Sequence, residues 1–396
     1  MAAGLQGAIE SAPVTRLHER QSYDPADFPV PAGREEEWRF TPLRRLRGLH
    51  TDNPPAPAAG VTVEVDPAPE VKTSVLAERS GPTPLGSTFV PSDRVSARAW
   101  RSFAEATVLT VPAETDTSRA TVVTVTGSGA ADGAGYGHLL VQAEPCSRAV
   151  VVLDYRGSAT YADNVELAVA DGASLSLVSL QDWADDAVHL SHHYITLGRD
   201  ARIRHTAVTL GGDVVRLAPS VRYDGPGGDA ELRGLYFADA GQHLEHRLFV
   251  DHDVPNCRSR VAYRGALQGA GAHAVWIGDV LIRPDATGTD SYEYNRNLVL
   301  TDGTRVDSVP NLEILTGEIV GAGHASASGR LEDHHLFYLM ARGIPYAEAR
   351  ALVIRGFFGQ LIATIEVPEL RERVAAAIEA ELARSLPAGP ARGARP

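Results

Sequence analysis

The chain has 396 residues and is 44% hydrophobic, which is enough to fill a sizeable core in one large domain or two to three ordinary ones. It carries 50 acidic and 37 basic residues, and its formal net charge of −13 disfavours binding to nucleic acid or to an anionic membrane. Its two cysteines, Cys146 and Cys257, are too few for a four-cysteine cluster or a zinc ribbon built by this chain alone. There is no secretory h-region and no apolar run long enough to cross a membrane, so we expect a cytoplasmic protein.

Nucleotide-binding motifs are missing from the sequence. The single lysine, Lys72, does not follow the glycine of a GxxxxGK[ST] loop, so no P-loop can form and we expect no nucleotide on this chain. The run from Gly127 to Gly137 is interpreted as a turn, because Asp132 takes the place of the third fingerprint glycine and a strand-like segment follows. No GxSxG or HExxH is present, so a hydrolase lacks its signature.

Residues 1–105 are predicted to form an amino-terminal helical region with a proline-rich linker. The acidic residues 35–37 favour the first turn of a helix, residues 51–60 have the composition of a linker, and residues 96–105 favour a second helix. The basic cluster is expected on a solvent-exposed helix face; it comprises Arg39, Arg44, Arg45 and Arg47.

Residues 106–328 are predicted to form an all-β core, because short β-branched runs alternate with Gly, Asp and Asn. A small residue follows a turn at Ala173, Ala201, Ala230 and Ser259, at intervals of 28, 29 and 29 residues. A repeat of this length is typical of a β-solenoid whose coils stack on one another, although a β-sandwich could also produce four such matches.

Residues 329–396 are predicted to form a helical domain with a frayed tail. The first helix carries Leu336, Tyr338 and Met340 and ends near Gly343 and Pro345. A second helix covers residues 346–365 with one apolar stripe, and a third covers about 369–386.

His324 is the first candidate for chemistry. Its neighbours in GAGHASASG are small, so the imidazole is uncrowded and could bind a metal or act as a base, although a tight solenoid turn also requires small residues. Strand alternation places His189 and His193 on one face and His192 on the other, so a three-ligand site is not expected there.

The other polar candidates favour ordinary structural roles. Cys257 is expected to be a small interior hydrophobe, and His252 beside Asp251 could relay a proton. His334 and His335 are adjacent on a helix and are expected at the surface. Three acids are expected to be solvated in a loop rather than to act as glycosidase carboxylates: Asp182, Asp185 and Asp186.

The segment from Asn295 to Pro345 resembles the closing segment of the SufB/SufD family of iron–sulfur cluster assembly proteins. The family motif Lys-Cys-x-His-Gly-Ala-Thr-x-Gly matches residues 321–329, with His324 on the histidine and Ala322 on the cysteine. Residues 251–259 match D-H-x-x-P-x-C-x-S, and the run from Trp38 to Pro42 is similar to the family's E-x-W-[KR]-[FY]-T-[PD]-L segment. The resemblance covers the chain from about residue 28 onward.

This resemblance implies a right-handed parallel β-helix flanked by helical regions, and a scaffold subunit rather than an enzyme. The SufD branch is favoured, because SufB members are usually longer and keep the cysteine that Ala322 replaces. It implies pairing with a SufB-like subunit, docking of a SufC-like ABC-type ATPase, and a sulfur-donating desulfurase as a further candidate partner. His324 would then help to hold iron or a transient iron–sulfur cluster with a cysteine of the SufB-like subunit; whether a flavin associates with the assembly is left open.

The resemblance also implies a docking site for the ATPase on the carboxy-terminal helices. The run EARALVIRGFFGQL is similar to the family's E-A-R-x-L-L-x-x-G-F docking run. The partner-binding residues predicted from it are Tyr346, Arg350, Ile354, Phe357 and Phe358.

Three alternatives remain open from the sequence. A solenoid acyltransferase with His324 as general base predicts hexapeptide repeats, which the 28–29-residue spacing does not support. A carbohydrate-active β-helix has only scattered acids in its favour. A SufB-like homodimeric scaffold differs from an obligate heterodimer only in its partner.

Overall fold

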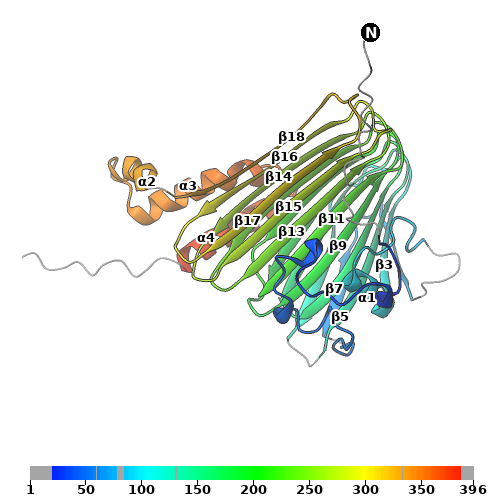
Figure 1. The fold of residues 1–396 in the computed structure, drawn as a ribbon, viewed down its shortest axis with the longest axis horizontal. Coiled ribbons are helices and arrows are strands. Elements are labelled where there is room, and N and C mark those ends of the chain that lie inside the picture. The colour runs from blue at the N-terminus through cyan, green and yellow to red at the C-terminus, as the bar shows by residue number, and fades with distance from the viewer. Residues whose placement is uncertain (1–19, 59, 78–83, 130–132, 332, 385–396) are drawn as a thin grey trace, which may run out of the picture.

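The computed structural model describes residues 20–58, 60–77, 84–129, 133–331 and 333–384. Successive strands alternate between two nine-stranded sheets, so each coil of the chain contributes one strand to each sheet (Figure 1). Within each sheet, neighbouring strands from β3 to β18 are parallel. The predicted parallel β-helix, flanked by helical regions, is confirmed.

Sheet I carries the even-numbered strands from β4 to β18 together with β1. In spatial order they are β1 (Val61–Asp66), β4 (Thr121–Ser128), β6 (Arg148–Ser158), β8 (Ser174–Trp183), β10 (Arg202–Thr209), β12 (Asp229–Ala238), β14 (Arg258–Leu267), β16 (Asp290–Val299) and β18 (Gly321–Arg330).

Sheet II carries the odd-numbered strands from β3 to β17 together with β2. In spatial order they are β17 (Arg305–Ile314), β15 (His273–Ile282), β13 (His243–His252), β11 (Val214–Tyr223), β9 (Val188–Leu197), β7 (Thr160–Val169), β5 (Gly135–Ala143), β3 (Ala106–Val111) and β2 (Lys72–Leu76).

The register of sheet I corrects the repeat that the sequence indicated. Ser174 pairs with Arg202, so Ala173 and Ala201 are equivalent and the 28-residue interval is right. Ala230, however, pairs with Ile203, two residues beyond Ala201. A shift of two residues keeps a side chain on the same face of a strand, so Ala230 still faces the interior. The predicted repeat of inward-facing small residues therefore holds despite the offset.

Tyrosine rings and glycines interlock in the interior of the solenoid. Tyr263 lies opposite Gly234 and Tyr236 lies opposite Gly265 across β12 and β14. A Cβ atom on Gly265 would lie 1.8 Å from the Tyr236 ring, so only glycine leaves room for it. Both tyrosines are fully buried as a result.

The amino-terminal region contains less helix than predicted. It forms three single-turn 3-10 helices and one α-helix, and two strands, β1 and β2, that pair antiparallel with β4 and β3. The acidic run makes only one short turn, because Pro42 disfavours helical backbone in the residue before it. The helices are η1 (Pro25–Asp27), η2 (Glu36–Trp38), η3 (Leu43–Arg45) and α1 (Arg94–Ser102).

The helix α1 begins two residues earlier than predicted and is also shorter. The Asp93 side chain accepts a hydrogen bond from the Ser96 backbone N–H at 2.7 Å. The Asp93 backbone N–H in turn donates to the Ser96 hydroxyl, which completes a capping box. Phe103 is extended and ends the helix.

The arginine cluster does not lie on a regular helix, and its predicted solvation is wrong for Arg45, which is half-buried. The other three arginines of the cluster are exposed, as predicted. Arg45 forms an ion pair with Asp213 at 2.6 Å, and Arg47 donates to the Thr160 hydroxyl at 3.0 Å. Because no regular helix forms here, these side chains reach sheet II and fasten the amino-terminal segment to it.

The helices α3 and α4 lie against the outer face of sheet I, and α2 projects beyond it (Figure 1). Ile354 and Phe358 share one hydrophobic cluster with Val208, Leu235 and Phe237. The second predicted helix ends three residues early, and the end of the third and the tail fall outside the described residues. The helices are α2 (Asp333–Met340), α3 (Tyr346–Ile362) and α4 (Pro368–Arg384). Among the described helices, none is long and apolar enough to cross a membrane.

Candidate functional site

His324 lies on β18, the last strand of sheet I, at the open end of the solenoid. It pairs in register with Glu293, which pairs in turn with Val261 of the preceding coil. Val261 belongs to the interior core, so the His324 side chain occupies an inward-facing position. Its side chain is nevertheless 43% exposed. The structure describes no further coil beyond β18 to cover it.

Glu293 is an acidic residue close to His324, and the sequence did not reveal it. The His324 Nδ1 atom lies 4.0 Å from the Glu293 Oε1 atom. The Glu293 side chain is 1% exposed, and neither carboxylate oxygen has a hydrogen-bond partner among the described residues. Burial, with a smaller effect from the charge of Asp279, raises the pKa of Glu293 to about 9. An acid at an inward position between Tyr292 and Tyr294 was the signal that could have revealed it.

A polar network holds the rest of this end in place. The side-chain amide of Asn295 donates to the Tyr236 hydroxyl at 2.9 Å. The Ser308 hydroxyl on β17 donates to the side-chain oxygen Oδ1 of Asn295 at 2.8 Å. Ser308 and Ser326 share a hydrogen bond of 2.7 Å that joins the two sheets. The strands that carry the site are therefore tied together by side chains as well as by backbone pairing.

No thiol reaches His324 from this chain. Ala322, on the family's cysteine position, pairs with Ser291 and packs against the interior core. Cys146 precedes β6, several coils away. Cys257 precedes β14 and is buried as predicted, and burial raises the pKa of its thiol. A cysteine ligand at this site must come from another molecule.

The histidine-rich strand β9 divides its side chains as the alternation predicted. His189 faces the interior and lies 3.1 Å from Asp163, and His193 lies 2.8 Å from His205. His192 faces the other way and contacts Ser220 at 3.2 Å. Over the described part of the chain, no group of three or more metal-ligating side chains is found.

The proposed relay between His252 and Asp251 is not formed. His252 is buried, stacks on Tyr223 and lies 2.9 Å from the Ser259 hydroxyl. Asp251 binds Arg283 instead, at 2.7 Å. Adjacent strand residues face opposite sides of a sheet, so the two side chains cannot meet.

Asp185 and Asp186 are exposed in the loop, as expected, whereas Asp182 lies on β8 and is half-buried. Asp182 binds Arg373 of α4 at 2.6 Å, and Asp185 accepts from Gln242 at 3.3 Å. Asp186 accepts a hydrogen bond from Ser158. The donors come from helix α4, from the turn before β13 and from the end of β6. His334, by contrast, is exposed on α2, as predicted.

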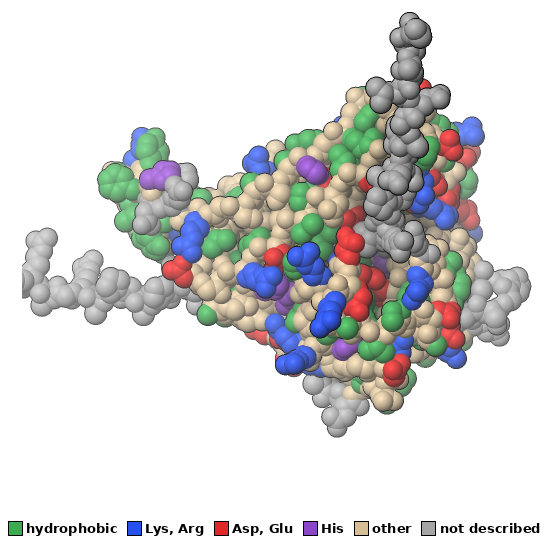
Figure 2. Space-filling view, in the orientation of Figure 1, with side chains coloured by type: hydrophobic (Ala, Val, Ile, Leu, Met, Phe, Trp, Pro, Cys, Tyr) green, Lys and Arg blue, Asp and Glu red, His purple; other side chains and the backbone are tan. Residues whose placement is uncertain are grey.

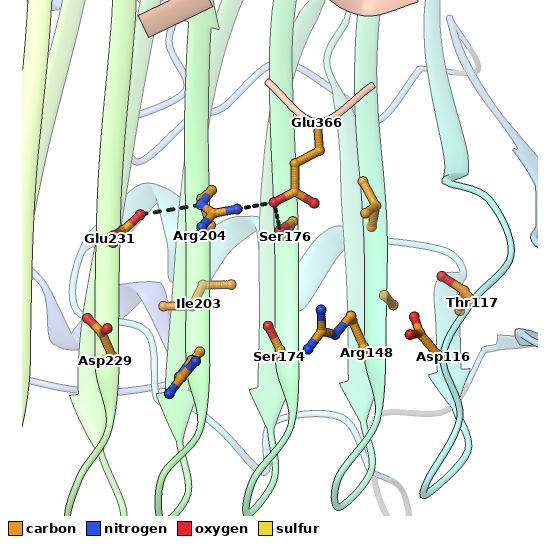
Figure 3. Close-up of a pocket in the computed structure, with 13 residues that line it drawn as sticks. Asp116, Thr117, Arg148, Ser174, Ser176, Ile203, Arg204, Asp229, Glu231 and Glu366 are labelled. Carbon is orange, nitrogen blue, oxygen red and sulfur yellow. Dashed lines mark hydrogen bonds and ion pairs between the residues drawn. The ribbon is translucent and has the colours of Figure 1, made fainter. Parts of the chain in front are cut away.

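A polar groove of about 350 Å³ lies on the outer side of sheet I, between the strands and the α3–α4 turn (Figure 3). Arg204 lies between Glu231 and Glu366, and Ser176 donates to Glu366 at 3.1 Å. No histidine or cysteine lines it, so its donor set does not suit iron. Its ion pairs instead anchor the helical domain to the sheet.

Most of the predicted partner-binding residues support the helical domain from within. Ile354 and Phe358 are fully buried against sheet I, and Arg350, also buried, binds Gln268 at 3.2 Å. Phe357 is partly buried, and its backbone carbonyl accepts from Arg264. Tyr346 alone of the five is exposed.

An exposed apolar surface nevertheless covers α2 and the start of α3. Figure 2 shows hydrophobic side chains on the part of the molecule that projects beyond the end of the sheets. Phe337 is 71% exposed. We call this surface the α2–α3 apolar patch; it comprises Phe337, Tyr338, Met340, Tyr346 and Leu352.

Comparison with known proteins gives one family. Residues 125–357 match the family model described as the SufBD core domain of the SUF system for FeS cluster assembly. An iron–sulfur cluster assembly SufBD family protein of Mycobacterium tuberculosis is 57% identical over 388 residues, which cover 96% of each chain. A SufBD family protein of Mycobacterium leprae is 54% identical over 385 residues, 95% of this chain and 97% of its own.

The likeness to SufD itself is more distant. The iron–sulfur cluster assembly protein SufD of Escherichia coli is 28% identical over 210 residues, 53% of this chain and 49% of its own. The family model covers more than half of the chain. The mycobacterial relatives match this chain over almost its whole length. The chain belongs to the SufB/SufD family of iron–sulfur cluster assembly proteins.

Proposed function

We propose that this chain is a SufD-type, non-enzymatic scaffold subunit that pairs through its open end with a SufB-type subunit. Iron or a nascent iron–sulfur cluster is the cargo, held between His324 and a cysteine of the partner. The observation that carries the proposal is the position of His324, an inward-facing residue of the last coil whose imidazole is exposed. A second solenoid stacked on this end would enclose it.

The two edge strands at this end favour such a partner. Sheet I ends at β18 and sheet II ends at β17, so both sheets present an unpaired edge there within the described chain. Unpaired edges bind added strands through backbone hydrogen bonds. The inward-facing residues His324, Ser326 and Ser328 of β18 are exposed, although the residues that pair with them on β16 are buried: Glu293, Asn295 and Asn297. A partner coil would bury them in the same way.

The identity of the partner follows from the ligand that this chain lacks. A site that serves iron and sulfur needs thiolate, and Ala322 cannot supply it. A SufB-type subunit that keeps the family cysteine would supply it across the interface. Mycobacterium tuberculosis has a second SufBD family protein, 25% identical to this chain over 203 residues, which shows that two members of the family occur in one organism.

The α2–α3 apolar patch is the surface we assign to a SufC-type ATPase. Contiguous exposed apolar side chains mark protein contacts more often than free surface. ATP would be hydrolysed by that partner, because the sequence of this chain has no P-loop. Ile354 and Phe358 would act indirectly, by holding α3 in place on sheet I.

The test is cluster assembly by the reconstituted complex. His324→Ala should leave the heterodimer intact on a sizing column, because backbone edges and not the imidazole join the subunits, while iron and acid-labile sulfide fall to a small fraction of wild type. His334→Ala, which removes an exposed imidazole from α2, is the matched control and should load normally. Normal loading by His324→Ala at limiting iron would refute the assignment.

A further inference from the structure

We infer that Glu293 is a second ligand at the open end, and that Glu293 and His324 together form a half-site for a divalent transition metal such as ferrous iron. This inference rests on the proposed function and names the protein groups through which this chain would hold its cargo. It concerns a side chain one coil behind the exposed surface, which is in register with His324.

The first argument is the unsatisfied state of the Glu293 carboxylate. A buried polar group is normally hydrogen-bonded, because leaving it unpaired destabilises the folded state. Mutational data put this loss of stability at about 1–3 kcal/mol. Glu293 is 1% exposed, and both its oxygens lack a partner among the described residues. The nearby amide of Asn295 is engaged with Tyr236 and does not serve it. No described donor competes for these two oxygens, so they are available to a cation.

The second argument is the distance between the two side chains. At 4.0 Å, the His324 Nδ1 and Glu293 Oε1 atoms are too far apart to share a hydrogen bond. Metal–nitrogen and metal–oxygen bonds of about 2.1 Å each span up to about 4.2 Å across a common ion. An ion therefore fits between the two atoms with little movement of either side chain.

The third argument is the space reserved for the carboxylate. A Cβ atom on Gly278 of β15 would lie 2.3 Å from the Glu293 Oε2 atom and 2.6 Å from the Trp276 ring. Glycine at this position lets the carboxylate and the indole lie side by side at the end of the interior. The acid is thus held in a fixed place by packing, as a metal ligand must be.

The half-site is incomplete by itself. Two protein ligands of one imidazole and one carboxylate suit ferrous iron, but a closed site needs more. No third histidine, cysteine or acid joins them among the described residues. The open coordination positions would then face the partner subunit, where a thiolate and sulfide can bind.

The experiment is an anaerobic titration of the full-length chain, alone and in complex with its SufB-type partner. Fe²⁺ binding is followed by calorimetry, and Co²⁺ serves as a spectroscopic probe. We expect Glu293→Gln and His324→Ala each to weaken binding at least tenfold. Glu318→Gln, which neutralises an exposed acid in the loop before β18, is the matched control and should change affinity less than twofold.

The Co²⁺ spectrum separates a ligand from a packing residue. Glutamine has the shape of glutamate, so thermal unfolding of Glu293→Gln should match or exceed that of wild type, while the Co²⁺ d–d bands shift because an anionic oxygen is lost. Wild-type affinity and spectrum in Glu293→Gln would overturn the inference and leave the role of His324 intact. Absence of saturable Co²⁺ binding by both the chain and the complex would overturn it too. Normal cluster loading by His324→Ala would refute the proposed function instead, whatever Glu293→Gln does.

Discussion

At the scale of single residues, the interior histidines make stability depend on pH. Burial lowers the pKa of His205 to about 4 and the pKa values of His246 and His252 to about 3. The unfolded chain therefore binds more protons than the folded one between about pH 6.5 and the folded pKa values. The contribution of these histidines to the free energy of unfolding is greatest above pH 6.5. It falls as the pH drops through this window, by up to about 1.4 kcal/mol per pH unit for each histidine.

Urea denaturation at pH 7.5, 6.5, 5.5 and 4.5 measures this slope. His252→Gln should reduce the slope by close to one proton, because one buried titrating group is gone. His334→Gln, at an exposed position, should leave the slope unchanged. A free energy of unfolding that stays constant between pH 7.5 and 4.5 would contradict the prediction.

The interlocked tyrosine and glycine pair gives a second prediction at this scale. Gly265→Ala places a methyl group 1.8 Å from the Tyr236 ring, so the ring or the strand must shift. We expect a loss of about 1–3 kcal/mol, the usual cost of overpacking a core. Gly329→Ala is the control, since its Cβ atom would meet nothing within 4 Å. Chemical denaturation compares them, and equal stability of the two variants would show that the ring has room to move.

At the residue scale, the sequence singled out His324 and did not single out Glu293; the metal-binding role of either residue stays a prediction. A motif identified His324, and strand alternation sorted the histidines of β9 correctly. Glu293 belongs to no motif, and it stands out only because its carboxylate has no hydrogen-bond donor nearby. Strand alternation could have placed this acid on the inward face, but only the structure reveals that both of its oxygens lack hydrogen-bond donors among the described residues.

At the scale of elements, a buried charge network fastens the amino-terminal segment to sheet II. Arg216 lies 3.2 Å from Asp93, 3.3 Å from Glu245 and 4.2 Å from the centre of the Trp38 ring. Thr41 also donates to Glu245, at 2.8 Å. Burial raises the pKa of Glu245, but the hydrogen bond from His243 and the charge of Arg216 outweigh it and lower that pKa to about 2.

Arg216→Ala should destabilise the protein by about 3–5 kcal/mol, because two buried carboxylates lose their cation. Arg222→Ala, on the same strand but in an exposed pair with Asp224, should cost at most about 1 kcal/mol. Urea denaturation gives both values, and limited proteolysis should cut the amino-terminal segment first in the Arg216 variant. Similar losses in the two variants would mean that the network does not hold the segment.

The helix α4 is anchored by Arg373, which binds Asp154 at 2.8 Å and Asp182 at 2.6 Å. Arg373→Ala should weaken this contact by about 1–2 kcal/mol, since the pair is partly exposed. Hydrogen exchange should quicken in α4 and stay unchanged in β8 to β12. Arg371→Ala on the same helix is the control, and faster exchange throughout the sheets would show that the anchor supports the whole fold.

Element prediction was good where the repeat was regular and poor at the amino terminus. Helices α3 and α4 follow from their apolar stripes, and the strands follow from alternation. Residues 35–47 favoured a helix by local composition, yet tertiary contacts of Arg45 and Arg47 with sheet II decided their conformation. Local sequence carries no information about a partner that lies more than a hundred residues away.

At the scale of the whole molecule, the open end predicts how the subunit pairs. Ser326→Arg places a long charged side chain on an exposed, inward-facing position of β18, where a partner coil would stack. We expect loss of the heterodimer with the SufB-type subunit on a sizing column, while the monomer stays folded. Thr62→Arg, exposed on β1 at the other end, is the control and should pair normally. Unchanged pairing in both variants would place the interface elsewhere.

The architecture of the whole chain could be predicted from the spacing of its coils, but its ends could not. Small residues at intervals of 28 and 29 gave the solenoid, with one coil misplaced by two residues between Ala201 and Ala230. Nothing in that spacing says whether the first or last coil is covered. That depends on β1 and β2, whose antiparallel pairing breaks the repeat.

Those two strands give the molecule a polarity with a consequence for assembly size. One terminus is finished by short reversed strands that bear charges such as Glu64 and Lys72, features that discourage further stacking. If a partner subunit stacks on the opposite end, as we propose, that contact leaves no open end of this chain for a third subunit. We therefore expect a closed pair of solenoids rather than an open-ended filament.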